Sequence, residues 1–211
     1  MLAVLDGGTY YHAETLYGSR YASIFDRVLY APDLDEESLK DVRLLIIPDR
    51  TCPQILRQKH HLILAVAERG DTVVILGENE AHDWVPGMHW LPKPTNFWWW
   101  LEPHAVAPQR LVTPEHELFQ FLSLNDCIWH FHGVLRPPEG VISLIDVPRD
   151  ENDEPGGAIL YDDRISTPGR LIVSTLDPFY HHGSHFMPAT TRFLDGFLSW
   201  AKVQAYTRRD S

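Results

Sequence analysis

Cysteine, basic residues and long apolar runs are all scarce in this chain of 211 residues. Two cysteines, Cys52 and Cys127, make no disulfide framework and favour a reducing compartment, so we expect a cytoplasmic protein. The net charge of −11 argues against a nucleic-acid partner, because phosphate binding requires a basic surface. No apolar run approaches the roughly 18 residues needed to cross a bilayer. The N-terminus lacks a basic segment, so we expect no signal peptide and no membrane partner.

The remaining composition is that of a globular protein, with 44% apolar residues. Its length predicts a single domain over 1–211. We expect an aromatic and proline-rich insertion at about 84–110 and a β-rich segment at about 126–161. Twelve histidines and seven tryptophans are the unusual features.

Short aliphatic runs alternate with helical patterns in the first half of the chain. Strands are predicted at Leu2–Leu5, Arg27–Tyr30, Leu44–Ile47 and Thr72–Leu76, with helices at 13–24, 35–40 and 53–69. Continuous aliphatic strands separated by helices are typical of βαβ units. The pattern therefore predicts an α/β fold with a parallel sheet covered on both faces.

The second half is less regular. It predicts a short helix at 117–122, strands at 127–132, 141–147, 158–161 and 171–176, and an acidic loop at 148–157. The closing helix begins near Pro188, with apolar side chains at helical spacing on one face.

The segment 70–82 has the pattern of a strand that delivers polar side chains to the edge of such a sheet. A charged turn at Gly70 leads into the run Thr72–Leu76, then Gly77 and Glu78-Asn79. In enzymes that place a nucleophile at such an elbow, Ser or Cys stands between glycines. Here a carboxylate and an amide stand there instead.

Two segments, 70–79 and 169–178, resemble the nucleophile strand and the late catalytic strand of the class I glutamine amidotransferase-like superfamily. The chain is most similar to its ThuA-like (trehalose utilisation) branch. This resemblance implies a flavodoxin-like three-layer sandwich with a mainly parallel sheet, and a carbohydrate-related ligand. The amidotransferase Cys-His-Glu triad is missing, because the elbow carries Glu78 and the late strand ends at Asp177. Neither cysteine has the elbow context, so glutaminase activity is not expected.

Ligands of open parallel sheets bind beyond the carboxyl ends of the strands, and polar residues gather at those positions here. The candidate general bases are Glu78 and Asp177, with His82 or His181 as acid or electrostatic stabiliser. The candidate ligand-binding residues are Asp6, Thr9, Tyr10, His12, Asp49, Arg50, Asn79, Tyr180 and His182. The alternative for each strand-end aspartate is a helix cap or a bond to loop amides.

The turn Asp6-Gly7-Gly8 allows close approach of the backbone to an anion or a sugar hydroxyl. It lacks the later glycines of the dinucleotide fingerprint, and a simple flexible turn is the alternative.

Histidines also suggest a metal site, although we predict no cofactor. The pair His130 and His132 would share one face of a strand, and His185 follows His181 and His182. Imidazoles with carboxylates suit zinc. A structural role beside Trp129 is the alternative.

The run Phe97–Trp100 is too aromatic for an ordinary exposed loop. Packing over the sheet, stacking on a sugar and a homo-oligomer interface through Trp98–Trp100 all use such rings.

These observations favour a cytoplasmic α/β protein that binds a small polar, carbohydrate-related molecule at the carboxyl edge of its sheet. The alternative is a non-enzymatic interaction or assembly protein on a degenerate enzyme fold.

Overall fold

The computed structural model describes residues 1–94, 101, 103–149 and 155–207. Its strands are β1 (Leu2–Asp6), β2 (Arg27–Tyr30), β3 (Leu44–Ile47), β4 (Thr72–Leu76), β5 (His89–Pro92), β6 (Arg110–Leu111), β7 (Gly133–Arg136), β8 (Ser143–Val147), β9 (Gly157–Asp163) and β10 (Arg170–Ser174). Its α-helices are α1 (Tyr10–Tyr17), α2 (Glu36–Leu39), α3 (Pro53–Glu68), α4 (Pro178–Gly183) and α5 (Pro188–Tyr206). Short 3-10 turns η1 (Ala31–Asp33), η2 (Ala81–Asp83), η4 (Glu117–Gln120) and η5 (Leu124–Cys127) join them.

A single sheet runs through the described residues. One side of it is a parallel block in the order β2-β1-β3-β4-β10, which is the 2-1-3-4-5 order of flavodoxin-like folds. Beyond β10 the pairing becomes antiparallel, through β9 and β7 to β5, while β8 pairs with both β9 and β6. Strand order therefore reverses between β1 and β3, where ligands bind in this class of sheet.

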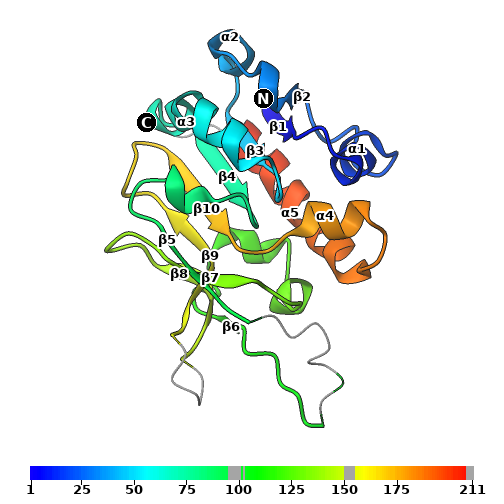
Figure 1. Ribbon diagram of the computed structural model, residues 1–211, viewed down its shortest axis with the longest axis vertical. Coiled ribbons are helices and arrows are strands. Elements are labelled where there is room, and N and C mark those ends of the chain that lie inside the picture. Colours follow the sequence, from blue (N-terminus) through cyan, green and yellow to red (C-terminus); the bar gives the residue numbers. More distant parts are fainter. Residues whose placement is uncertain (95–100, 102, 150–154, 208–211) are drawn as a thin grey trace.

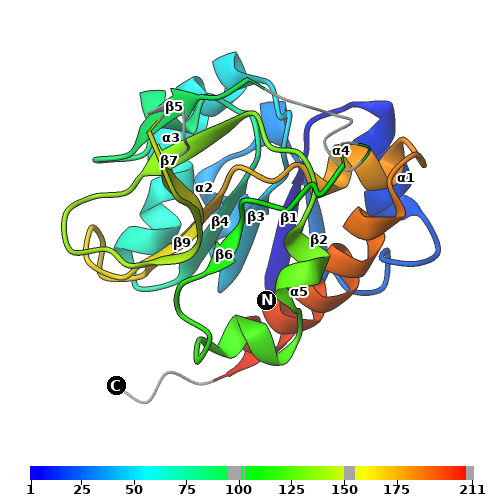
Figure 2. The same cartoon turned by 90° about the horizontal axis from the view of Figure 1, so that it is seen from below.

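Helices cover both faces of the parallel block, which gives three layers (Figures 1 and 2). Helices α1, α4 and α5 lie on one side of the sheet and α2 and α3 on the other. Because side chains alternate along a strand, Leu44 and Ile46 of β3 join the core beneath α5, whereas Leu45 and Ile47 join the core beneath α3. All four side chains are fully buried, as the aliphatic run predicted. The expected flavodoxin-like α/β fold is confirmed.

The first helix differs from its prediction at 13–24. It is α1, Tyr10–Tyr17, because the Thr9 hydroxyl caps it by accepting the His12 amide and Gly18 ends it. Turns follow it, and they still bury Tyr21 in the core.

The strand predicted at 127–132 is wrong. Ser123 and Asp126 form a reciprocal capping box that begins the 3-10 turn η5, so the chain through Cys127 is helical. The strand is β7, Gly133–Arg136, and His130 and His132 lie in the connection before it. The short helix expected at 117–122 is the 3-10 turn η4.

Part of the segment predicted as an insertion is sheet. Strand β5 pairs with β7 and β6 pairs with β8, so His89–Pro92 extends the sheet beyond the parallel block. The Phe97–Trp100 run lies outside the described residues. Among the described helices, none combines the length and apolar character that a membrane span requires.

Candidate functional site

Polar side chains follow the ends of neighbouring parallel strands. Asp6 ends β1, Asp49 and Arg50 follow β3, Glu78 follows β4, and Asp177 follows β10. Since β1, β3, β4 and β10 are adjacent and parallel, these positions meet at one edge of the sheet. The sequence predicted this convergence from aliphatic runs alone.

The turn after β4 brings two of these strand ends into contact. Gly77 has a φ of +61°, which glycine adopts without strain, and its amide donates to the Ser174 carbonyl at 2.8 Å. A Cβ on Gly77 would lie 2.5 Å from the Asp49 Cβ and 3.2 Å from the Asp177 Cβ. The absent side chain therefore allows two aspartates to pack against the elbow.

Arg50 joins the two predicted general bases. Its Nη2 lies 3.3 Å from Asp177 Oδ2 and 3.5 Å from Glu78 Oε2. Its guanidinium also stacks over the Tyr180 ring, 3.8 Å from the ring centre. Arg50 has a φ of +57°, and its amide donates to the Glu78 carbonyl. Backbone and side chain thus hold the ends of β3 and β4 together.

Asp49 is completely buried, and its side chain caps the first turn of α4. Its two carboxylate oxygens accept the amides of Phe179 and Tyr180, at 2.8 and 2.9 Å. Burial and the neighbouring Asp177 raise the pKa of Asp49, an effect that its two amide bonds oppose. Asp49 therefore positions α4 and has no surface on which to meet a ligand.

Three histidine rings surround Asp177. His181 Nε2 lies 3.2 Å from Asp177 Oδ1 and 2.9 Å from His130 Nε2. The ring centres of His130 and His132 are 5.3 Å apart, and His132 Nδ1 lies 3.8 Å from Glu78 Oε1. Ligand atoms of His130, His132 and Asp177 all fall within 4.8 Å of one another.

The charges of this cluster follow from burial and proximity. Burial raises the pKa of Asp177, but His181, His130 and Arg50 outweigh it and lower that pKa below its usual value. Burial lowers the pKa of His130 to about 4, although Asp177 opposes the shift. At neutral pH the buried centre therefore holds an ionised Asp177 beside a neutral His130.

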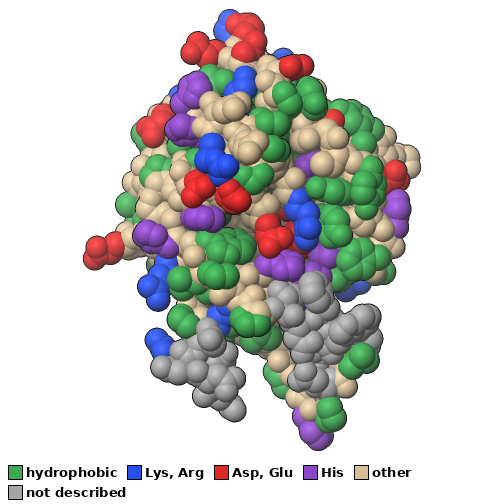
Figure 3. Space-filling view, in the orientation of Figure 1, with side chains coloured by type: hydrophobic (Ala, Val, Ile, Leu, Met, Phe, Trp, Pro, Cys, Tyr) green, Lys and Arg blue, Asp and Glu red, His purple; other side chains and the backbone are tan. Residues whose placement is uncertain are grey.

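A cavity of about 250 Å³ opens on the other side of Glu78. It is lined by Pro53, Glu78, Glu80, His82 and Trp90. Trp90 of β5 lies directly on Gly133 of β7, where a Cβ would stand 2.5 Å from the indole ring. In Figure 3, acidic, basic and histidine side chains gather over the connection from β10 to α4. Glu78 links the cavity to the cluster around Asp177.

The catalytic candidates accordingly fall into two pairs. Glu78 and His82 line the cavity, whereas Asp177 is buried beside Arg50 and His181 is buried next to a separate cavity of about 180 Å³. Of the ligand-binding candidates, Arg50 and Tyr180 lie beside Glu78 or Asp177.

Other candidates build the scaffold. Asp6 accepts the Tyr17 hydroxyl and the Gly8 amide, and the Asn79 amide group donates to the Leu76 carbonyl. His12 Nδ1 accepts the Gly7 amide, so its Nε2 donates to the Asp49 carbonyl. These residues fix the turns that carry the site.

Three further candidates have other partners than Asp177, although two of them, His182 and His185, share a cavity with His181. The Tyr10 hydroxyl contacts Ser184, His182 Nδ1 contacts the Thr191 hydroxyl, and His185 pairs with Glu14. His185, a candidate metal ligand, does not join His130 and His132. The sequence did not predict Trp90 as a site residue, because a single tryptophan before the aromatic run has no pattern that indicates binding.

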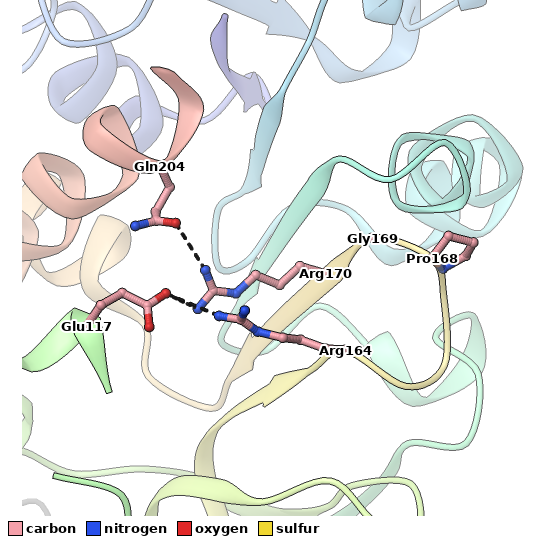
Figure 4. Close-up of a pocket in the computed structure, with 6 residues that line it drawn as sticks. All are labelled: Glu117, Arg164, Pro168, Gly169, Arg170 and Gln204. Carbon is pink, nitrogen blue, oxygen red and sulfur yellow. Dashed lines mark hydrogen bonds and ion pairs between the residues drawn. The ribbon is translucent and has the colours of Figure 1, made fainter. Parts of the chain in front are cut away.

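A second cavity, of about 440 Å³, lies at the opposite end of β10 (Figure 4). Its charged side chains neutralise one another: Arg170 pairs with Glu117 and Asp162, and Arg164 pairs with the same two carboxylates. Figure 4 shows Arg164, Arg170 and Gln204 converging beside Glu117. Because it lies at the amino end of β10, this cavity is not where an open parallel sheet binds ligands.

No family model matches the chain, and no curated protein matches it. Solved structures do align with the chain. The cytoplasmic protein STM1381 from Salmonella typhimurium LT2 aligns over 99% of this chain and 100% of its own, with a TM-score of 0.56 and 13% identity. The cytoplasmic protein STM3548 from Salmonella typhimurium aligns over 94% and 97%, with a TM-score of 0.52 and 12% identity.

A ThuA-like protein from Bacteroides uniformis ATCC 8492 also aligns, over 97% of this chain and 88% of its own. Its TM-score is 0.48 at 12% identity. The two Salmonella proteins share the fold of this chain along nearly its whole length. At such identities the likeness concerns architecture alone. Together with the strand order, it agrees with the flavodoxin-like α/β fold expected from the sequence.

Proposed function

We propose that this chain is a cytoplasmic protein that binds a small polar molecule, carbohydrate-related in chemistry, at the carboxyl edge of its parallel sheet. The observation that carries the proposal is the 250 Å³ cavity lined by Pro53, Glu78, Glu80, His82 and Trp90. Its volume lies just below the roughly 300–1,000 Å³ typical of small-molecule pockets. That size favours a ligand of about one sugar unit.

The lining supplies both kinds of contact that a sugar needs. Glu78 and Glu80 offer carboxylate oxygens as acceptors for hydroxyl groups, and His82 offers a ring nitrogen. Trp90 is half-buried and presents an apolar ring on which the C–H face of a sugar packs. Binding pockets usually combine an apolar surface with a small number of polar groups.

Arg50 prepares Glu78 for this role. The Arg50 guanidinium lies between Glu78 and Asp177 and stacks over Tyr180, so it fixes the Glu78 carboxylate beside the cavity before any ligand binds. A carboxylate already fixed in place loses little conformational freedom on binding. Where a reaction occurs, Glu78 acts as the base and His82 as its acid partner, since both line one cavity.

The proposal is tested by thermal unfolding in the presence of glucose, mannose, galactose and trehalose. A ligand that binds the native state raises the apparent stability. We expect at least one saccharide to raise the unfolding temperature of the wild type, and Glu78→Gln to abolish the shift. Glu115→Gln removes an exposed carboxylate that does not line the cavity and serves as the matched control.

The non-enzymatic alternative makes the opposite prediction. An interaction or assembly protein would give no shift with any saccharide and a self-association that depends on concentration. Sedimentation velocity over a range of concentrations measures that association. An unfolding temperature that no saccharide changes, together with a concentration-dependent dimer, would overturn the binding proposal.

A further inference from the structure

His130, His132 and Asp177 converge although they come from different parts of the chain. The two histidines lie in the connection before β7, and Asp177 precedes α4. Their ligand atoms lie within 4.8 Å of one another. Zinc bonds of about 2.0–2.2 Å in a tetrahedral arrangement place neighbouring ligand atoms about 3.4 Å apart. Small rotations of the three side chains therefore suffice to close the set around one ion.

We propose that a divalent transition metal, with zinc as the first choice, binds between His130, His132 and Asp177. Two imidazoles with one carboxylate form a donor set that suits zinc and neighbouring first-row metals, whereas calcium and magnesium favour oxygen ligands. The inference goes beyond the saccharide proposal and does not rest on it, because none of the three ligands lines the cavity.

The state of the Asp177 carboxylate favours a cation. The side chain is completely buried, and its Oδ1 makes no hydrogen bond within the described part of the chain, although His181 Nε2 is 3.2 Å away. A buried carboxylate oxygen without a hydrogen bond is costly. A metal ion at this position would satisfy Oδ1, while Oδ2 keeps its contact with Arg50.

His181 is suited to hold this arrangement in place. Its Nε2 lies within 3.2 Å of Asp177 Oδ1 and 2.9 Å of His130 Nε2, so one ring nitrogen reaches two of the three ligands. Contacts of this kind orient ligands and tune the affinity of metal sites. We therefore assign His181 as a positioning residue rather than a ligand.

The surroundings balance the charge of an ion. Arg50 pairs with Asp177, and its charge is shared between Asp177 and Glu78. His132 is half-buried, and its Nδ1 faces Glu78 Oε1 at 3.8 Å. Three protein ligands leave a fourth tetrahedral position, which is the pattern of catalytic rather than structural zinc sites.

The test is a calorimetric titration of chelator-treated protein with Zn²⁺, with metal analysis after dialysis. We expect the wild type to retain one equivalent. His132→Gln should weaken binding by at least about tenfold, as the loss of a ligand should weaken it no less than the loss of an orienting contact. His61→Gln removes an exposed histidine of α3 and should bind as the wild type does.

Co²⁺ provides a second readout, since its visible spectrum reports the ligand set. The spectrum should change in His132→Gln and stay the same in His61→Gln. His132 lies at the half-buried side of the cluster, so its replacement tests the site even where Asp177→Asn fails to fold. Wild-type protein that retains no zinc, or His132→Gln and wild type with equal affinity, would overturn the proposal. Trp90→Phe should leave zinc affinity unchanged, which separates the outcome from that of the saccharide proposal.

Discussion

Gly77 and Asp49 approach so closely that a Cβ on the glycine would stand 2.5 Å from the Cβ of the aspartate. The contact joins the end of β4 to the end of β3, at the turn where the sequence pattern predicted an elbow. Here the elbow serves to pack two buried carboxylates against the backbone. The space that a side chain would fill is occupied by Asp49 and Asp177.

Gly77→Ala should therefore destabilise the protein strongly. A left-handed backbone costs a residue with a Cβ about 1–2 kcal/mol, and overpacking adds roughly 1–3 kcal/mol. Gly70→Ala is the matched control, because Gly70 also has a positive φ but its Cβ would meet nothing within 4 Å. Urea unfolding should show a loss of about 3 kcal/mol for Gly77→Ala and about 1 kcal/mol for Gly70→Ala. Equal losses would contradict the close packing.

His12 should make stability depend on pH. Burial lowers its pKa from the ordinary 6.5, because a charged ring would lose water while its Nδ1 already accepts the Gly7 amide. The folded state then holds fewer protons than the unfolded state, so the contribution of His12 is complete above pH 6.5 and is lost as pH falls below it. Asp6 and the Asp49 carbonyl oppose the shift without cancelling it.

The measurement is urea unfolding of wild type and His12→Gln at several pH values from about 8 to 5. The wild type should lose more stability than the variant as the solution becomes acidic, since the amide does not titrate. A stability difference between the two proteins that is constant over this range would show that His12 titrates alike in both states.

Removing one partner of the Asp162–Arg170 ion pair should lower the free energy of unfolding far more than removing a partner of a surface ion pair. Arg170 donates to both oxygens of Asp162, at 2.9 and 2.8 Å, and their side chains are 4% and 6% exposed. Removing one partner of a buried pair costs about 3–5 kcal/mol. Asp162→Asn should therefore lose about 3 kcal/mol in chemical unfolding.

Asp146→Asn provides the comparison for this pair. Asp146 pairs with Arg110, whose side chain is 61% exposed. An exposed pair contributes at most about 1 kcal/mol, so this variant should be nearly as stable as the wild type. If both variants lose the same amount, the buried network beside α5 does not carry the stability assigned to it.

The two cysteines should react very differently with a thiol reagent. Cys127 is completely buried, and burial raises the pKa of its thiol, whereas Cys52 is partly exposed before α3. Thiolate is the reactive form. Native protein should therefore be labelled at Cys52 alone, and Cys127 should react only after denaturation. Peptide mass spectrometry identifies the labelled residue, and native labelling of Cys127 would contradict its burial.

Continuous aliphatic runs made the parallel half of the sheet predictable. Runs such as Leu44–Ile47 are buried on both faces, and burial on both faces needs helices on either side. Turn chemistry then placed Gly77 and Asp177 at one edge. The antiparallel half was harder to predict, because local hydrogen bonds decide where its strands begin. The Ser123–Asp126 capping box makes the chain helical through Cys127, so the strand lies at 133–136 and not at the predicted 127–132.

The site was predictable in outline and not in detail. Strand ends could be aligned from the sequence, but the separation of Glu78 from Asp177 by Arg50 depends on side-chain packing. The contact between His130 and His181 joins residues 51 positions apart, and no local pattern encodes it. Trp90 lines the cavity because a glycine on the neighbouring strand leaves room for its ring.

The binding of a sugar against Trp90 is tested most directly by nuclear magnetic resonance of the indole N–H groups. Seven tryptophans give the spectrum, and Trp90→Phe identifies the signal of Trp90. Titration with glucose, mannose, galactose and trehalose should move that signal with at least one saccharide, and Glu78→Gln should abolish the movement. A Trp90 signal that stays fixed through all four titrations would contradict the account.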